Sequence, residues 1–261
     1  MTNRKFAIVT GASTGIGFEL ASIAAEQGYD LLVVADEPLI NAAAADFKTH
    51  GGAVESVEAD LSTIDGVDRL LAAADGRRID LLCANAGHGL GGGFLSQDVS
   101  GWRHVIDTNI TGTVYLLQKV LNDMVAAGKG KVLVTGSIAG YIPGSFHAVY
   151  NGSKAFVDNF TEALRNELKD EKGITITTLM PGATETEFFD RADMNDTKVG
   201  QAKKADANKV ARDGWDALMA GKGHVVSGLM NKLQVAASSV IPASTLAQSH
   251  RDMAEPGSDQ D

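Results

Sequence analysis

The chain has 261 residues, of which 44% are hydrophobic and 21% charged, and its formal net charge at pH 7 is −10. That length can bury the core of one α/β domain without disulfides or metals, and the acidic balance excludes nucleic acids and anionic membrane surfaces as main partners, because both need a basic face. The single cysteine, Cys83, rules out a disulfide within the chain, and no secretory signal or membrane-length apolar stretch is visible, so we expect a cytoplasmic protein without membrane contact.

Short β-branched apolar runs alternate with longer helical patterns along the chain. The runs that predict strands lie at residues 6–9, 31–34, 54–58, 81–84, 132–134, 174–179 and 224–226. The helical patterns lie at residues 16–27, 39–50, 64–74, 102–126, 150–170 and 206–220. This alternation implies right-handed crossovers, so we expect an α/β protein: one doubly wound domain with a mainly parallel seven-stranded sheet and helices on both faces.

No linker interrupts this rhythm, so residues 1–253 are predicted to form a single domain. Residues 184–208 are polar and charged and follow the end of a strand. Because ligands bind beyond the carboxyl ends of the strands in open α/β sheets, we expect this segment to be a substrate lid. The apolar segment 229–246 indicates packing or a subunit contact rather than membrane association. The polar tail, 254–261, is expected to be disordered.

A glycine-rich turn directly follows the first predicted strand. Residues 10–17 read Thr-Gly-Ala-Ser-Thr-Gly-Ile-Gly. A strand, a glycine-rich turn and a helix N-terminus together form an anion site, because backbone N–H groups and the helix dipole face the ligand. We therefore expect a dinucleotide pyrophosphate here, although a tight structural turn would leave the same pattern. The residues assigned to this contact are Gly11, Ser13, Thr14, Gly15, Ile16 and Gly17.

This turn resembles the Thr-Gly-x3-Gly-x-Gly fingerprint of the short-chain dehydrogenase/reductase family, and the resemblance extends over residues 5 to about 190. It implies a Rossmann-type domain that binds a nicotinamide dinucleotide. The Asn-Ala-Gly after the fourth strand and the Pro-Gly after the sixth strand also look like family elements, although Ala84 stands where a further Asn is usual. The resemblance places the following residues beside the cofactor: Asn85, Ala86, Gly87, Pro181, Gly182, Thr184 and Thr186.

The end of the second strand bears on which nucleotide binds. A carboxylate at Asp36 can accept both ribose hydroxyls of an adenosine and would repel a 2′-phosphate. NADP-preferring relatives usually place Arg or Lys here or beside the glycine-rich turn, so we expect NAD(H), with NADP(H) less favoured. As an alternative, Asp36 merely starts the turn before Pro38. Asp60 and Leu61, at the end of the third strand, look like the family's adenine contact, and an Asp there is also an ordinary turn residue.

Ser137, Tyr150 and Lys154 carry the catalytic prediction. Tyr150 and Lys154 are four residues apart at a helix start, which puts them on one face, and Ser137 follows the preceding strand. A neighbouring ammonium and the positive nicotinamide ring favour the phenolate of a tyrosine. By resemblance, Tyr150 exchanges a proton with the substrate oxygen, Ser137 hydrogen-bonds that oxygen, and Lys154 also binds the nicotinamide ribose.

Asn109 completes the predicted catalytic set. It lies among poor helix formers, residues 105–113, inside an otherwise good helix, and such a local conflict often marks a functional position. The resemblance implies that Asn109 holds a water linking the lysine to solvent. A surface asparagine on a tolerant helix is the alternative.

The predicted function is an NAD(H)-dependent oxidoreductase that interconverts a secondary alcohol and a ketone. The loops expected to wall the substrate, 89–94, 138–146 and 184–190, contain only carboxylates as charges, which favours a neutral, moderately apolar substrate. Their aromatic side chains are Phe94, Tyr141, Phe146, Phe188 and Phe189. An NADP(H)-dependent carbonyl or 3-oxoacyl reductase and a non-catalytic dinucleotide-binding regulator are the alternatives.

Neither a metal nor a macromolecule of another kind is expected to bind. One cysteine and dispersed histidines give no metal-ligand set; the histidines are at positions 50, 88, 104, 147, 224 and 250. His88 and His147 lie near the expected pocket mouth, as possible substrate contacts. By resemblance, we expect a homodimer or homotetramer built from the helices at 102–126 and 150–170.

Overall fold

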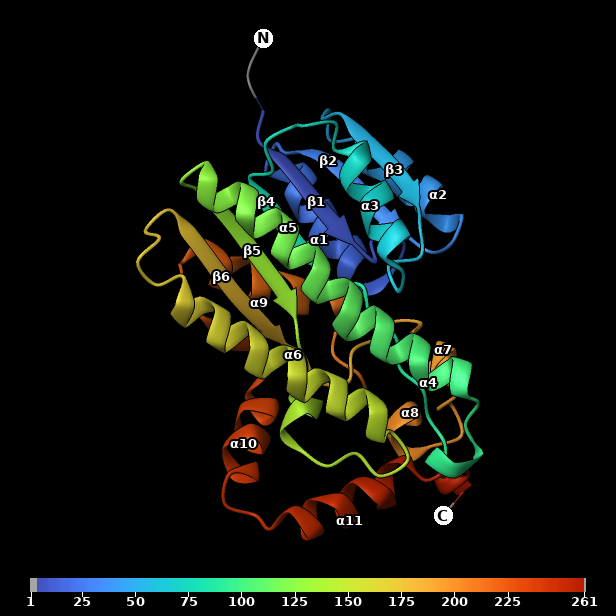
Figure 1. The fold of residues 1–261 in the computed structure, drawn as a ribbon. Coiled ribbons are helices and arrows are strands. Elements are labelled where there is room, and N and C mark those ends of the chain that lie inside the picture. Colours follow the sequence, from blue (N-terminus) through green and yellow to red (C-terminus); the bar gives the residue numbers. More distant parts are fainter. Residues whose placement is uncertain (1–3, 261) are drawn as a thin grey trace.

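The computed structural model describes residues 4–260 and shows a parallel sheet with helices on both of its faces (Figure 1). The strands are β1 (Phe6–Thr10), β2 (Asp30–Ala35), β3 (Val54–Glu58), β4 (Leu81–Ala84), β5 (Gly130–Thr135), β6 (Ile174–Met180) and β7 (His224–Val226). They lie in the order β3-β2-β1-β4-β5-β6-β7, and every neighbouring pair is parallel. The predicted doubly wound seven-stranded sheet is confirmed.

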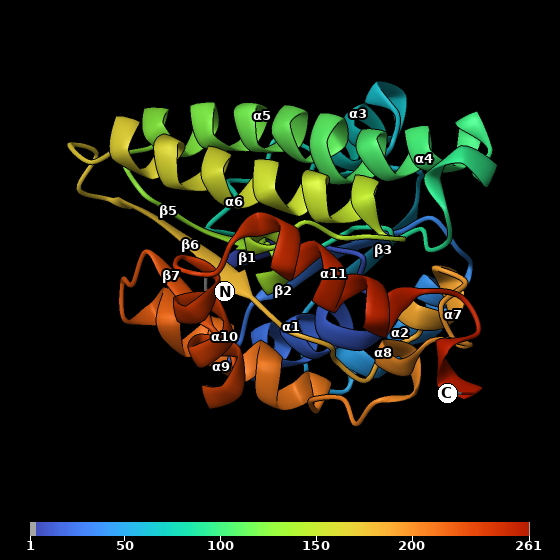
Figure 2. The ribbon, with the colours of Figure 1, turned by 90° about the horizontal axis from the view of Figure 1, so that it is seen from below.

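Helices cover the sheet in two layers, with α1, α2 and α9 on one face and α3, α4, α5 and α6 on the other (Figure 2). The helices are α1 (Gly15–Glu26), α2 (Leu39–Lys48), α3 (Ile64–Ala73), α4 (Val99–Ile106), α5 (Thr113–Ala126), α6 (Ala148–Glu167), α7 (Phe188–Arg191), α8 (Lys198–Gln201), α9 (Ala207–Met219), α10 (Leu229–Ser238) and α11 (Ala243–Ala254). Within residues 4–260, none of them combines the length and the apolar character that crossing a membrane requires.

The central strands are apolar throughout because both of their faces are covered. In β1, Ala7 and Val9 pack with α1, α2 and α9, whereas Phe6 and Ile8 pack with α3, α5 and α6. Successive side chains of a strand point to opposite faces, so this one buried strand joins both halves of the core.

Several elements lie beyond the carboxyl ends of the strands, at the lower edge of Figure 1. They are α7 and α8, which belong to the predicted lid at 184–208, and the two C-terminal helices, α10 and α11. Thr184 forms an isolated parallel bridge with Ala205, which closes the lid segment into a compact loop. Phe189 and Met194 of that segment join a small apolar cluster of their own. Opening and closing of this segment stays a prediction.

The expectation of disorder at 254–261 differs from the structure. The Gly257 amide donates to the Asp196 carboxylate at 2.9 Å, and Ser258 is buried in a single 3-10 turn. These contacts tie the tail to the lid segment, which its polar composition does not reveal. Asp261 lies outside the described residues.

Candidate active site

A cavity of about 380 Å³ opens at the carboxyl ends of the strands. This is the edge where ligands bind in open α/β sheets. Of the predicted cofactor-binding and catalytic residues, only Gly17 and Asn109 do not line it. The fold therefore brings the predicted cofactor and catalytic residues to one place.

The glycine-rich turn after β1 has a backbone that only glycine adopts without strain. Gly11 and Gly15 have φ angles of +62° and +57°, and a Cβ at Gly17 would collide with the carbonyl oxygen of Gly11. The helix α1 begins at Gly15, so its first amides lack partners within the helix. This arrangement fits an anionic pyrophosphate, the group predicted here.

Asn85 ties the glycine-rich turn to the centre of the sheet. Its amide nitrogen donates to the carbonyl oxygens of Thr10 and Gly11 at 3.2 and 3.3 Å, and its oxygen accepts from the Thr135 hydroxyl at 3.0 Å. The side chain of Asn85 thus stabilises the junction of β1, β4 and β5. This agrees with the sheet-stabilising role that the family resemblance implies.

Three other residues predicted to contact the nucleotide, Asp60, Thr184 and Thr186, make contacts within the protein. The Asp60 carboxylate accepts from the Ser62 amide at 2.8 Å, as an ordinary turn residue does. Thr184 donates to the Gly182 carbonyl at 2.9 Å, and a Cβ at Gly15 would lie 2.6 Å from the Thr186 methyl group. Contacts of these residues with a nucleotide stay predictions.

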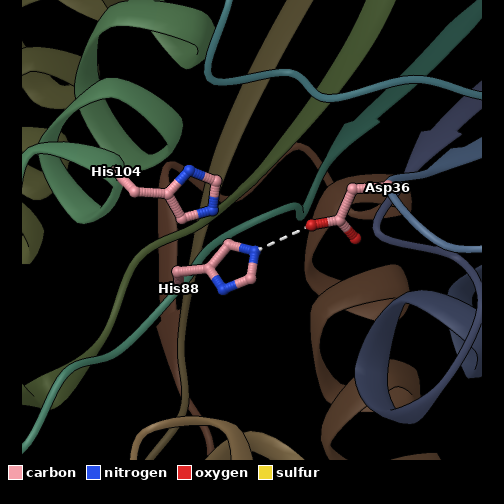
Figure 3. Close-up of side chains that lie close together, drawn as sticks. All are labelled: Asp36, His88 and His104. Carbon is pink, nitrogen blue, oxygen red and sulfur yellow. Dashed lines mark hydrogen bonds and ion pairs between the residues drawn. The ribbon is translucent and has the colours of Figure 1, made fainter. Parts of the chain in front are cut away.

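Asp36, at the end of β2, faces two histidines rather than open solvent alone (Figure 3). His88 Nε2 lies 3.1 Å from the Asp36 carboxylate, and this hydrogen bond is the main reason that the pKa of Asp36 falls below its ordinary value. The His104 ring packs edge-on against the His88 ring at a centroid distance of 4.5 Å. Histidines that are dispersed in the sequence are therefore brought together by the fold.

Glu37 adds a charged network that the sequence did not reveal. It accepts from the Ser13 hydroxyl at 2.6 Å and from the Arg191 guanidinium at 2.7 Å, and Arg191 also pairs with Glu187. The expectation that only carboxylates supply charge around the pocket is therefore wrong, because Arg191 lines the cavity too. Arg191 lies one residue beyond the loop considered, and its partner Glu37 is 154 positions away in the sequence. Ser13, predicted to contact the nucleotide, is bonded to Glu37 here.

Tyr150 and Lys154 project from the start of α6 beside Ser137. The Lys154 ammonium donates to the Thr135 carbonyl at 2.8 Å and lies 5.8 Å from the centre of the Tyr150 ring. Burial raises the pKa of Tyr150 to about 12, while a hydrogen bond from the Ser137 hydroxyl acts in the opposite direction. The phenol therefore holds its proton at neutral pH in this structure.

Asn109 lies in a π-helical turn, Asp107–Gly112, between α4 and α5. Its side-chain oxygen accepts from the His88 amide at 2.8 Å, and its nitrogen donates to the His88 carbonyl and the Ser153 hydroxyl, both at 2.9 Å. Asn109 is 1% exposed, so it is not a surface residue. The predicted continuous helix at 102–126 is interrupted here, and single π-turns of this kind are frequent at functional sites.

Comparison with known proteins decides the family. The family model for short chain dehydrogenase matches residues 5–197. The chain belongs to the short-chain dehydrogenase/reductase family. The resemblance drawn from its motifs is thereby confirmed, and the chain is an oxidoreductase of this family.

Individual members agree with this assignment. An uncharacterized oxidoreductase of Staphylococcus epidermidis is 30% identical over 210 residues, which span 79% of this chain and 87% of that protein. A short-chain dehydrogenase from Sphingobium yanoikuyae, solved in complex with NADPH, is 28% identical and has a TM-score of 0.80, covering 91% of this chain and 96% of the other. A short-chain dehydrogenase/reductase from Burkholderia phymatum, solved in complex with NAD, shares the fold, with a TM-score of 0.81, 23% identity and coverage of 89% and 92%.

Asp158 is a buried carboxylate of this site that the motif analysis missed. It lies one helical turn beyond Lys154 on α6, beneath the Ser137 loop, and a Cβ at Gly140 would lie 2.6 Å from one of its oxygens. Its carboxylate makes no well-formed hydrogen bond within the described residues, and the Ser137 amide and Lys154 ammonium are the polar groups beside it. Burial raises the pKa of Asp158 and lowers that of Lys154. The sequence does carry a signal for Asp158: it stands four residues after Lys154, as Lys154 stands four residues after Tyr150, so the three lie on one face of the helix.

His147 packs against the Tyr150 phenol. Its ring stacks on the Tyr150 ring at a centroid distance of 4.4 Å and an interplanar angle of 15°, and Phe188 contacts Tyr150 at 5.0 Å. Burial, with a smaller contribution from His250, lowers the pKa of His147 to about 3. His147 therefore presents a neutral ring to the cavity at physiological pH.

The walls of the substrate region differ in part from those expected. Phe188 and Phe189 line the cavity, whereas Phe94, Tyr141 and Phe146 do not, and Phe94 and Tyr141 are 54% and 40% exposed. The C-terminal helices α10 and α11 supply further wall residues, and the packing or subunit contact expected of residues 229–246 stays a prediction. These wall residues are Asn231, Gln234, His250 and Met253.

Proposed function

We propose that this protein interconverts a secondary alcohol and a ketone with NAD(H), and that Tyr150 is the acid/base. The observation that carries the proposal is the convergence of Tyr150, Ser137 and Lys154 on the cavity that the glycine-rich turn also lines. The glycine cradle fits a dinucleotide pyrophosphate, and the catalytic side chains lie at the other end of the same cavity.

The chemistry follows from the properties of these side chains. A bound nicotinamide nucleotide supplies the hydride in one direction and accepts it in the other. Tyr150 donates its proton to the ketone oxygen during reduction and takes the alcohol proton during oxidation, while the Ser137 hydroxyl orients that oxygen. The raised pKa of Tyr150 suits the reductive direction. For oxidation, the Lys154 ammonium and the positive ring of the oxidised nucleotide favour the phenolate.

The preference for NAD(H) rests on the charges at the end of β2. Asp36 carries a lowered pKa and stays ionised, which favours ribose hydroxyls and disfavours a 2′-phosphate. The nearby cation, Arg191, is already paired with Glu37 and Glu187. NADP(H) is the second candidate, because Arg191 lies at this edge and the Sphingobium relative was solved with NADPH.

The proposed substrate is a neutral, moderately apolar ketone or alcohol. His147 is neutral, Phe188 and Met253 are apolar, and Arg191 is held by its two carboxylates. A charged substrate would have to be desolvated here, and the Lys154 ammonium, the cation beside Tyr150, is already bonded to the Thr135 carbonyl. The single cysteine, Cys83, is free and buried, and the absence of a disulfide within the described residues supports a reducing, cytoplasmic site of action.

The test is a fluorescence titration of the purified protein with NADH and with NADPH, in a buffer containing a chelator. We expect NADH to bind at least about tenfold more tightly, and Asp36→Ala to remove most of that preference, since a hydrogen bond to a charged group contributes about 1.5–3 kcal/mol. Asp46→Ala, which removes an exposed carboxylate from α2, is the matched control and should bind like the parent. Tighter binding of NADPH would overturn the role of Asp36, and no binding of either would overturn the enzyme proposal.

A further inference from the structure

Asp36, His88 and His104 form a cluster with the composition of a metal site. Asp36 comes from the end of β2, His88 from the loop after β4, and His104 from α4 (Figure 3). One ligand atom from each lies within 4.8 Å of the others. Two imidazole nitrogens and one carboxylate oxygen are the ligand set that first-row divalent transition metals take in proteins.

One of the ligand distances is already close to that in a metal site. In a tetrahedral Zn²⁺ site with bonds of about 2.1 Å, ligand atoms lie about 3.4 Å apart. His88 Nε2 and the Asp36 oxygen are already 3.1 Å apart. The His88 and Asp36 side chains are 24% and 35% exposed, so an ion can enter from solvent and water can supply the remaining ligand.

The middle ligand is held in place from behind. Both backbone groups of His88 are bonded to the side chain of Asn109, at 2.8 and 2.9 Å. His104 lies on the last turns of α4, directly before the π-turn that carries Asn109. The two imidazoles therefore approach each other from a shared rigid support, which lowers the cost of ordering them around an ion.

The local charge balance favours a cation. Arg191, the guanidinium nearest to Asp36, is paired with Glu37 and Glu187. Arg103, next to His104, lies 3.8 Å from the Asp107 carboxylate. Carboxylates thus offset the charge of both arginines, and the whole chain has a formal net charge of −10.

We propose that Asp36, His88 and His104 bind one divalent transition-metal ion of the Zn²⁺ class, and that this ion and the nucleotide exclude each other. The exclusion rests on the proposed function, in which Asp36 receives the adenosine ribose. An ion on Asp36 and His88 occupies the mouth of that part of the cavity, and it engages the carboxylate that the ribose requires. His104 does not line the cavity, so it belongs to the metal site alone.

The direct test is calorimetric titration of the full chain with Zn²⁺ as its chloride salt. We expect one ion per chain, binding at least about tenfold more weakly in His104→Gln and in His88→Gln, since even partners of metal ligands contribute about 10–100-fold to affinity. His50→Gln, which removes an exposed histidine beyond α2, is the matched control and should bind like the parent. Unchanged binding in both ligand variants, or no binding to the parent, would overturn the site.

The second measurement tests the mutual exclusion. The NADH titration is repeated with saturating Zn²⁺ on the parent and on His104→Gln, with the chelator left out. With Zn²⁺ at about nine times the parent's dissociation constant, the apparent dissociation constant for NADH should rise about tenfold in the parent and less than about twofold in the variant, because competition requires the bound ion. Any Zn²⁺–nucleotide complex in solution would affect both proteins equally. An equal response of both proteins would overturn the exclusion.

The two proposals fail separately. Zn²⁺ binding that is lost in His104→Gln, together with no nucleotide binding, would uphold the metal site and reject the proposed enzyme. Nucleotide binding without any calorimetric response to Zn²⁺ would support the proposed enzyme and reject the metal site.

Discussion

The Tyr150 ring contacts the rings of both His147 and Phe188, and the Lys154 ammonium beside it is anchored on the Thr135 carbonyl. The phenol and the ammonium are thus held by contacts from three parts of the chain that no local pattern connects. Positioned acid/base groups act efficiently only when their geometry is maintained in this way. At the residue scale, the geometry of the site therefore depends on contacts from outside the Tyr-x3-Lys motif.

Tyr150→Phe tests the acid/base role. It removes the proton that the substrate oxygen exchanges while keeping the ring in contact with His147 and Phe188, so kcat/KM should fall by about 10²–10⁴-fold. Steady-state kinetics measure this with whichever ketone the parent reduces. Tyr115→Phe, which removes an exposed phenol bonded to Asp68, is the matched control and should retain full turnover. Equal activity in Tyr150→Phe would remove that residue from the mechanism, and absence of turnover in the parent would favour the non-catalytic regulator.

Asp158 gives the site a pH-dependent stability. Burial raises the pKa of its carboxyl from 3.8 to about 7, so the native protein keeps this proton where the unfolded chain has lost it. As pH rises through that interval, stability is lost because the buried charge must form. Asp158→Asn has no such charge.

The free energy of unfolding of Asp158→Asn relative to the parent should therefore increase between about pH 4 and about pH 7. Urea denaturation across that range measures it. Glu171→Gln, which removes an exposed carboxylate beyond the end of α6, should show no comparable trend. A difference between Asp158→Asn and the parent that stays constant or declines with pH would contradict the assignment of a buried, destabilised carboxylate.

At the scale of elements, the sequence predicted most where local and global preferences agree. Strand β1 and the turn after it were readable because an apolar strand, glycines and a helix start follow one another within a few residues. The helix at 102–126 was predicted as continuous, and the poor helix formers around Asn109 were noted. The sequence does not predict that these residues form a π-turn, because the turn depends on hydrogen bonds from Asn109 to His88 and Ser153 in other elements.

Gly17→Ala tests the glycine-rich turn as an element. The added methyl group would collide with the Gly11 carbonyl, so the turn must shift, and we expect a stability loss of about 1–3 kcal/mol. Nucleotide binding should weaken at least about tenfold, because the amides that face the pyrophosphate move with the turn. Thermal unfolding and the NADH titration measure the two effects.

Gly152→Ala is the matched control on α6. It meets nothing within 4 Å, so it should leave stability unchanged or raise it by up to about 1 kcal/mol. If Gly17→Ala behaved like Gly152→Ala, the turn would have no need of glycine at that position.

At the scale of the whole molecule, the contacts that the sequence does not predict are those between residues far apart in the chain. Arg191 pairs with Glu37 across 154 positions, and the Ser145 hydroxyl donates to the Ala247 carbonyl across 102 positions. No local sequence pattern indicates either contact. The place of α10 and α11 at the cavity is equally long-range. After β7 the chain returns to the carboxyl edge of the sheet, and apolar periodicity alone does not specify that return. Alternation of strands and helices predicts a sheet and its active edge, but the contacts made across that edge require the folded molecule.

Oligomerisation is argued at this scale, and we propose a homodimer or homotetramer through α5 and α6. On α6, Phe156 is 42% exposed and stacks on Phe160 at 5.8 Å, which leaves an aromatic pair on the outer side of the helix that carries Tyr150. Phe156→Glu should convert the assembly to a smaller species in light scattering, because a charge buried between copies is costly. Leu229→Glu makes the same kind of change on α10, where Leu229 is 73% exposed, and should leave the assembly intact. The opposite pattern would move the interface to the C-terminal segment, and a monomeric parent would reject the assembly.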